Sequence, residues 1–98
     1  MKADPLSIEW DAGNWPKCGK HGVSRVEIEQ VLGAGRIAPD IRHSAQEPRY
    51  IAVGRTQEQR PVFVAFAVRK QPDGRQTIRP ISARYMHARE AKRYEEST

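Results

Sequence analysis

Two arginines, Arg79 and Arg84, stand within and at the end of a short apolar stretch near the carboxyl end of the chain. A guanidinium group is planar, keeps its charge at physiological pH and can meet two phosphate oxygens at once. If the stretch is a strand that leads into a helix, both groups lie toward one end of a sheet. We therefore predict that Arg79 and Arg84 clamp one phosphate. The alternative is that they are solvated residues of a sheet edge.

The charge of the chain indicates which molecule supplies that phosphate. The 98 residues include 17 Lys and Arg against 12 Asp and Glu, a net charge of +5. A domain this basic favours a polyanionic partner, either nucleic acid or an acidic protein segment. If the partner is a nucleic acid and its backbone is cleaved there without a metal, cations must hold the negative charge that grows on the phosphate. Each well-placed donor is then typically worth ~3 kcal/mol in rate.

Cleavage of a nucleic-acid backbone would also need groups that transfer protons. His21 is a candidate because the ordinary pKa of histidine is ~6.5, and Glu47 is a candidate base. Each has a structural alternative. His21 could orient the loop before a helix, and Glu47 could hold the guanidinium of Arg49 or Arg79 in place.

Three more residues are candidates for contact with RNA. Lys20 could bind phosphate or be solvated, and Arg49 could bind RNA or form an ion pair. Tyr94 could contact the substrate or transfer a proton. The alternative for Tyr94, together with Glu90, is to pack and hydrogen-bond the last helix onto the sheet.

No cofactor or metal site is predicted. His21, His43 and His87 are scattered, whereas a closed zinc site needs about four clustered ligands. Cys18 has no second cysteine to pair with and is interpreted as a small buried thiol rather than as a catalytic partner of His21. No apolar run approaches ~18 residues and none resembles a signal peptide, so we expect a cytoplasmic protein without a membrane anchor.

The elements that position these residues are expected to form one α+β domain over residues 1–98. Ser24 and Glu27 have the spacing of a capping box, which predicts a helix over 25–32 that follows a shorter helical piece near Pro16. Residues 33–48 lack any period and are expected to form a long loop. Strands are predicted at 7–10, 49–56, 61–70 and 76–84, and a final helix at 86–96.

The strand predicted at 61–70 is apolar on both faces, so it is expected to be central and covered on both sides. Pro80 lacks an N–H group, which predicts an edge or a bulge in the last strand. The expected fold is a small four-stranded antiparallel sheet packed with two N-terminal helices and a C-terminal helix.

Several motifs occur along the chain in a fixed order. They are Trp10-Asp11, Lys20-His21-Gly22, Glu47-x-Arg49, the stretch Ile81–Arg84, and Glu90 followed by Tyr94. In this combination the chain, from about residue 8 to residue 96, resembles the BrnT family of toxins from type II toxin–antitoxin systems.

The resemblance implies a RelE-like fold and a ribonuclease that inhibits translation. It also implies a BrnA-type antitoxin that neutralises the toxin, expected as a heterotetramer of two toxins and two antitoxins, with operator DNA bound only through the antitoxin. The chain departs from the commoner family pattern in two places: Gly13-Asn14 follow Trp10-Asp11, and Lys17 stands four residues before His21. The residues that match family motifs are Lys20, His21, Glu47, Arg49, Arg79, Arg84, Glu90 and Tyr94.

Two other classes of function remain open. A basic nucleic-acid-binding module without catalysis would bind RNA in a salt-dependent manner and leave it intact. An interaction protein would use its basic face only to dock an acidic partner.

Overall fold

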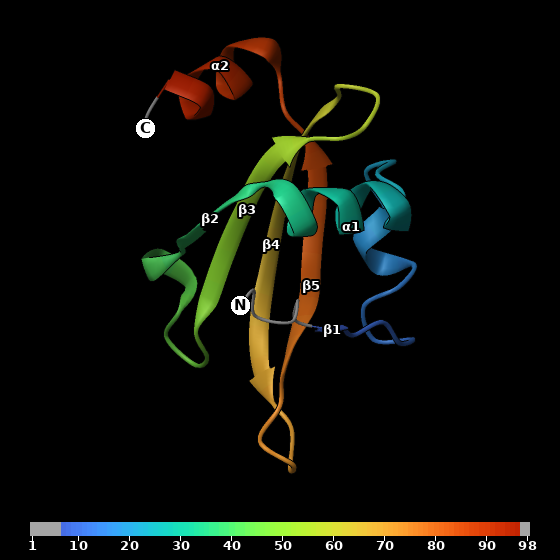
Figure 1. Ribbon diagram of the computed structural model, residues 1–98, viewed down its shortest axis with the longest axis vertical. Coiled ribbons are helices and arrows are strands. Elements are labelled where there is room, and N and C mark those ends of the chain that lie inside the picture. Colours follow the sequence, from blue (N-terminus) through green and yellow to red (C-terminus); the bar gives the residue numbers. More distant parts are fainter. Residues whose placement is uncertain (1–6, 97–98) are drawn as a thin grey trace, which may run out of the picture.

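A computed structural model describes residues 7–96 and has a five-stranded mixed sheet at its centre, in the order β1-β5-β4-β3-β2 (Figure 1). Two α-helices and two short 3-10 turns, η1 and η2, accompany the sheet. The strands are β1 (Ser7–Ile8), β2 (Arg36–Pro39), β3 (Arg49–Arg55), β4 (Pro61–Lys70) and β5 (Gln76–Tyr85), the helices are α1 (Arg25–Ala34) and α2 (Ala88–Glu96), and the turns are η1 (Lys17–Gly19) and η2 (Ile41–His43).

The expected fold, four antiparallel strands with three helices, is wrong in three respects. β1 runs parallel to β5 and pairs Ile8 with Ile78. β2 lies within the expected loop and pairs antiparallel with β3, although all four of its residues are exposed and no burial pattern marks it as a strand. The first expected helix is only the 3-10 turn η1, so the described residues contain two α-helices.

α1 begins as predicted, at a capping box. The Ser24 hydroxyl accepts a hydrogen bond from the Glu27 N–H, and the Glu27 carboxylate accepts one from the Ser24 N–H. These bonds satisfy two backbone donors that the first turn of a helix leaves free. The helix continues one residue past Gly33 and ends at Ala34, with Gly35 as its cap.

The core lies mainly on one face of the sheet, where α1 packs across β3 and β4 (Figure 1). Ile28 and Val31 of α1 meet Val64 and Phe66 of β4 in this cluster, and all four are almost fully buried. The other face carries a smaller cluster, in which α2 contributes to the packing of Val53, Phe63, Met86, Ala91 and Tyr94. β4 is therefore central and apolar on both faces, as its sequence predicted.

A bulge interrupts β5 beside Pro80, also as predicted. Ala65 of β4 pairs with Ser82 whereas Phe66 pairs with Pro80, so Ile81 is an extra residue in the strand. The bulge shifts the alternation of side chains between the two faces of the sheet by one residue. Two residues five positions apart would point to opposite faces of a regular strand, but Arg79 and Arg84 point to the same face, opposite α1.

No helical segment among residues 7–96 combines the length and the apolar character that a membrane crossing requires.

Candidate functional site

A row of three residues crosses the sheet on the face opposite α1. Arg49 of β3 pairs with Ala67 of β4, and Ala67 pairs with Arg79 of β5. Directly paired residues point to the same side of a sheet. Because neighbouring strands are ~4.8 Å apart, the two arginine Cα atoms lie roughly 10 Å from each other. Only the methyl group of Ala67 stands between them, so both guanidinium groups can reach one anion.

This row forms the floor of a pocket of about 160 Å³. Lys17 of η1, Glu47 and Arg69 also line it, so the pocket contains four basic side chains, including the two arginines of the row, and one carboxylate. Arg69 follows Ala67 by two residues and therefore lies on the same face of β4. Arg69 was not among the predicted site residues. It could have been identified from the predicted strand 61–70, because side chains alternate between the two faces of a strand.

Arg79 is held from one side by the segment that follows β1. Its Nη1 donates to Asp11 Oδ2 at 2.7 Å and its Nη2 to Asp11 Oδ1 at 3.0 Å, while Glu9 Oε1 lies 3.4 Å from Nη1. The hydrogen bonds from Arg79, with a further one from the Gly13 N–H, lower the pKa of the Asp11 carboxyl to about 2. The same contacts with Asp11 raise the pKa of Arg79. They leave the Nε–H and one Nη2 hydrogen of Arg79 for a substrate.

Asn14 fixes the position of that segment. Its buried Nδ2 donates to the carbonyl oxygens of Glu9, at 2.9 Å, and of Pro80, at 3.1 Å. Its Oδ1 accepts from the Asp11 N–H at 2.9 Å. One amide thus ties the turn at Asp11 to β5, and this sets where Asp11 meets Arg79.

Glu47 and Arg49 line the pocket without forming an ion pair with each other. Within residues 7–96, no ion pair joins Glu47 to Arg49 or to Arg79. The structural alternative for Glu47, a partner that holds a guanidinium, is therefore not seen in this arrangement. Both side chains are half-buried at the entrance to β3.

Arg84 lies on the same face as Arg79 but at another place along the sheet. It pairs with Phe63, which is four residues from Ala67 along β4, a separation of ~13 Å. Its Nη1 and Nη2 donate to the two carboxylate oxygens of Glu90 at 2.7 and 2.8 Å, and the guanidinium lies 4.4 Å from the centre of the Phe63 ring. The predicted clamp of one phosphate by Arg79 and Arg84 would therefore have to bridge ~13 Å along the sheet, whereas the arginine that shares a row with Arg79 is Arg49.

Lys20 and His21 are exposed on the loop before α1 and do not line the pocket. Tyr85, at the last position of β5, approaches this loop and donates hydrogen bonds to the Gly22 carbonyl at 3.4 Å and to Glu27 at 2.6 Å. Of the predicted catalytic and substrate-binding residues, the structure brings together Glu47, Arg49 and Arg79.

The Tyr85–Glu27 contact anchors that loop to the sheet. Burial would raise the pKa of the Glu27 carboxyl, but hydrogen bonds from Tyr85 and Ser24 outweigh it and lower that pKa. Burial and the contact with Glu27 both raise the pKa of Tyr85. The guanidinium of Arg60 covers the Tyr85 ring at 3.7 Å from its centre. We therefore interpret Tyr85, Glu27 and Arg60 as residues that hold the loop in place, and we assign them no catalytic role.

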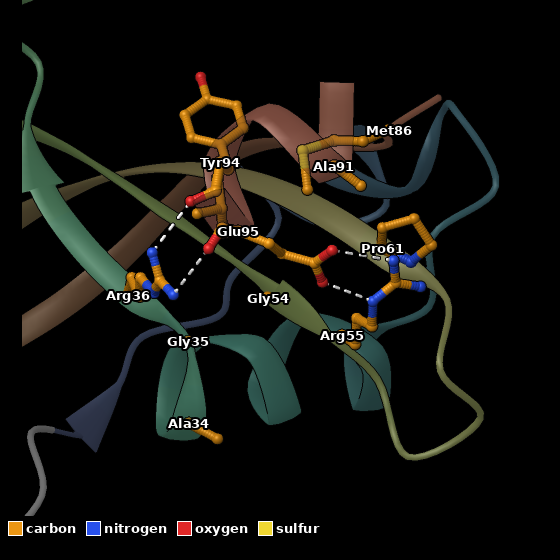
Figure 2. A pocket seen from close by; sticks show the side chains of 11 residues that line it. Ala34, Gly35, Arg36, Gly54, Arg55, Pro61, Met86, Ala91, Tyr94 and Glu95 are labelled. Carbon is orange, nitrogen blue, oxygen red and sulfur yellow. Dashed lines mark hydrogen bonds and ion pairs between the residues drawn. The ribbon is translucent and has the colours of Figure 1, made fainter. Parts of the chain in front are cut away.

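A larger pocket of about 300 Å³ lies under α2 (Figure 2). Its arginines are already engaged with the end of that helix. Arg36 donates to the carbonyl oxygens of Tyr94 at 2.9 Å and Glu95 at 3.4 Å, and Arg55 donates to the Glu95 carboxylate at 2.7 and 3.3 Å. A cation at a helix C-terminus is favourable because it meets the negative end of the helix dipole. We therefore interpret these contacts as the attachment of α2.

Tyr94 belongs to this attachment. Its side chain is half-buried and its ring centre lies 6.4 Å from that of Phe63. Together with the Glu90–Arg84 pair, this places the two residues of the last motif between α2 and the sheet, which is the structural alternative predicted for them.

Cys18 is the buried thiol that its sequence context indicated. It is 1% exposed in η1, and burial raises the pKa of its thiol. Residues 7–96 contain no group of three or more His, Cys, Asp or Glu side chains placed to hold a metal ion.

Comparison with family models gives a match over residues 10–90 to a family described as ribonuclease toxin, BrnT, of type II toxin–antitoxin system. The matched range includes the whole pocket of Arg49, Ala67 and Arg79, and the Asp11 that holds Arg79. No curated protein matches the chain.

Proposed function

The chain belongs to the BrnT family of ribonuclease toxins of type II toxin–antitoxin systems, and we propose that its pocket at Arg49, Ala67 and Arg79 is where RNA is cleaved. The observation that carries this proposal is the row itself. Two guanidinium groups flank a methyl group on the same face of three paired strands, so a phosphate above Ala67 meets a cation on each side.

In the proposed reaction the RNA attacks its own backbone and no metal takes part. The 2'-oxygen forms a bond to the adjacent phosphorus while the bond from phosphorus to the 5'-oxygen breaks. Glu47 accepts the proton of the 2'-hydroxyl, and Lys17 supplies a proton to the leaving 5'-oxygen. Arg49 and Arg79 hold the two non-bridging oxygens, on which negative charge grows. The products carry a 2',3'-cyclic phosphate and a 5'-hydroxyl.

We propose a different role for Lys20, His21 and Arg84. They lie outside the pocket, so we assign them contacts with RNA away from the cleaved bond. Removal of His21 is then expected to weaken RNA binding, with little change in the rate at which bound RNA is cleaved.

The test is cleavage of an end-labelled RNA in EDTA by the wild type and by Arg49→Ala. Arg49 is the better choice for this test because, unlike Arg79, it has no ion pair among residues 7–96 whose loss would disturb the fold. Loss of one such donor is expected to slow cleavage about 10²–10³-fold. Arg75→Ala is the matched control, since Arg75 is an exposed arginine in the turn between β4 and β5. Equal cleavage by all three proteins would place the reaction elsewhere.

A second candidate function is an RNA-binding module without catalysis. The observation that favours it is the pairing of Arg79 with Asp11, which already gives this guanidinium a structural partner. Such a module would bind RNA less tightly as salt increases and would leave it intact at every enzyme concentration. The end-label experiment separates the two functions.

We also propose that the toxin inhibits translation and is neutralised by a BrnA-type antitoxin in an assembly of two copies of each. The family match supports an antitoxin partner and an RNA substrate. Co-expression with the protein encoded beside it should restore growth, and light scattering of the purified complex should give the mass of the four-chain assembly. A complex of another composition would overturn the stoichiometry alone.

A further inference from the structure

The sheet face that carries Arg49 and Arg79 continues from the pocket toward α2. α1 covers the opposite face, and α2 is the only helix among residues 7–96 that contributes to the cluster on this one. Between the pocket and α2, the paired residues are Ala65 and Ser82, next to Ile81 of the bulge. Ala65 and Ile81 are half-buried and Ser82 is exposed, so this part of the sheet surface is accessible to another molecule.

The far end of this face is basic. One shallow depression is lined by Arg84, His87, Arg89, Glu90 and Arg93, and it connects the end of β5 with α2. A second is lined by Arg89, Lys92, Arg93 and Glu96, on α2 itself.

The two sides of α2 differ in charge. Two of its three acidic residues, Glu90 and Glu95, are paired with Arg84 and Arg55 of the sheet, whereas Glu96 lies beside Arg89, Lys92 and Arg93, where three positive charges outnumber it. Arg89, Lys92 and Arg93 are exposed, and no ion pair joins them to residues 7–96. The acidic side of the helix is thus neutralised by the sheet, whereas its basic side has charge available for another molecule.

We infer that this face is the path of a single RNA strand, which runs from the pocket past Arg84 onto the basic side of α2. The inference rests on the proposed function for the identity of the strand. Arg79 and Arg84 lie ~13 Å apart along the sheet, so they are placed to hold different phosphates of one strand. The bulge at Ile81 is what gives both arginines the same face.

The chemistry between the two ends also suits a single strand. Proteins that hold single strands combine a basic track for the backbone with planar side chains on which bases stack. The guanidinium of Arg84 lies over Phe63 at 4.4 Å from the ring centre, and the Arg84 side chain is 43% exposed. A base can stack there while Arg89 and Arg93 hold the next phosphates.

The experiment compares two variants that each lose two positive charges. Arg89→Gln with Arg93→Gln removes charge from α2, and glutamine keeps good helix propensity. Lys70→Gln with Arg75→Gln is the matched control near the β4–β5 turn, at the other end of the sheet. Binding of a labelled RNA of about 16 nucleotides, the upper size of a single-strand site, is measured over a range of salt concentrations. Hydrogen exchange in α2 verifies that the helix persists.

The α2 variant is expected to lower the slope of log affinity against log salt by about 1.4, because each phosphate that the protein no longer neutralises accounts for ~0.7 of that slope. Its kcat/KM for the long RNA should fall about tenfold while cleavage of a dinucleotide is unchanged. An α2 variant that matches the control in binding and in cleavage would overturn the path. If it binds RNA normally but no longer binds the antitoxin, the basic side of α2 is an antitoxin surface and the path is again wrong.

The RNA path and the proposed function can fail separately. The salt slope measures binding, so it tests the path even if the wild type cleaves no RNA. Conversely, a wild type that cleaves the dinucleotide retains its proposed function even if both variants bind the long RNA equally well.

Discussion

The guanidinium of Arg79 and the carboxylate of Asp11 form a two-bond ion pair between positions 68 residues apart in the sequence. Asp11 is thus at once the anchor of the segment after β1 and an internal anion beside the proposed phosphate site. Arg79→Ala removes the anchor and leaves the Asp11 carboxylate without this partner beside the site, so its effect on cleavage is meaningful only beside a measurement of folding.

Stability in acid should depend on this pair. The pKa of Asp11 is about 2 in the folded protein, below its ordinary value of 3.8, so its contribution is present above about pH 4 and is lost as the pH falls toward 2. Asp11→Asn removes a group whose charge stabilises the fold only in that upper range. We expect the difference in Tm between wild type and Asp11→Asn to be largest above about pH 4 and to vanish near pH 2.

Thermal unfolding monitored by circular dichroism at several pH values tests this expectation. The pKa values of Glu27 and Glu90 are also lowered, so the wild type loses stability in acid for several reasons, and only the comparison with the variant isolates Asp11. A Tm difference that is constant from neutral pH to pH 2 would show that the charge of Asp11 does not stabilise the fold.

Two glycines at the end of α1 should respond oppositely to alanine. A Cβ at Gly35 would lie 2.6 Å from the carbonyl oxygens of Val31 and Val53, closer than backbone atoms tolerate, so Gly35→Ala should be strongly destabilising. A Cβ at Gly33 meets nothing within 4 Å, and alanine is the better helix former by about 0.5–1 kcal/mol, so Gly33→Ala should stabilise the protein. Urea unfolding of the two variants gives the signs, and destabilisation by both would contradict the steric account.

The Arg84–Glu90 pair should contribute to attachment of α2 and not to the chemical step. Arg84 is partly exposed, so the coupling energy from a double-mutant cycle of Arg84→Ala and Glu90→Ala is expected to be about 1 kcal/mol or less. Cleavage of a dinucleotide by Arg84→Ala should equal that of the wild type, because Arg84 lies outside the pocket. A large loss of dinucleotide cleavage would return Arg84 to the reaction centre.

The end of α2 should loosen when Glu95 loses its charge. Glu95→Gln weakens the two contacts with Arg55, whereas Glu96→Gln is a neighbouring change at an exposed carboxylate that has no ion pair within residues 7–96. Amide exchange in the last turn of α2 should be faster in the first variant than in the second. The difference should shrink as salt screens the wild-type pair. Equal exchange in both variants would mean that the Arg36 contacts alone hold the helix end.

The helix start and the central strand were accessible from the sequence because local signals determine them. The capping box at Ser24 specified where α1 begins. Apolar residues at both the even and the odd positions of 61–70 specified β4 as a central strand. β2 was missed because its exposed residues have no side-chain pattern and its pairing with β3 is made by the backbone alone. The direction of β1 was missed because two residues cannot indicate whether a partner far along the chain runs parallel or antiparallel.

The candidate site was predictable in its residue types but not in its grouping. Arginine as the phosphate ligand and glutamate as a candidate base followed from chemistry, and three of the predicted residues, Glu47, Arg49 and Arg79, line one pocket. The grouping of Arg79 with Arg49 instead of Arg84 depends on the register between β3, β4 and β5, and no residue type in those strands reports register. Arg69 shares the face of Ala67 because side chains alternate along a strand, whereas Lys17 reaches the pocket from η1 through tertiary packing that no local pattern indicates.

The parallel pairing of β1 with β5 bears on the order in which the protein is made. During synthesis Ser7 and Ile8 emerge 70 residues ahead of their partners Thr77 and Ile78. The hairpins of β3, β4 and β5 can form from neighbouring segments, but β1 must wait, and so must the contact of Asp11 with Arg79. The pocket of Arg49, Ala67 and Arg79 is therefore incomplete until β5 has been synthesised.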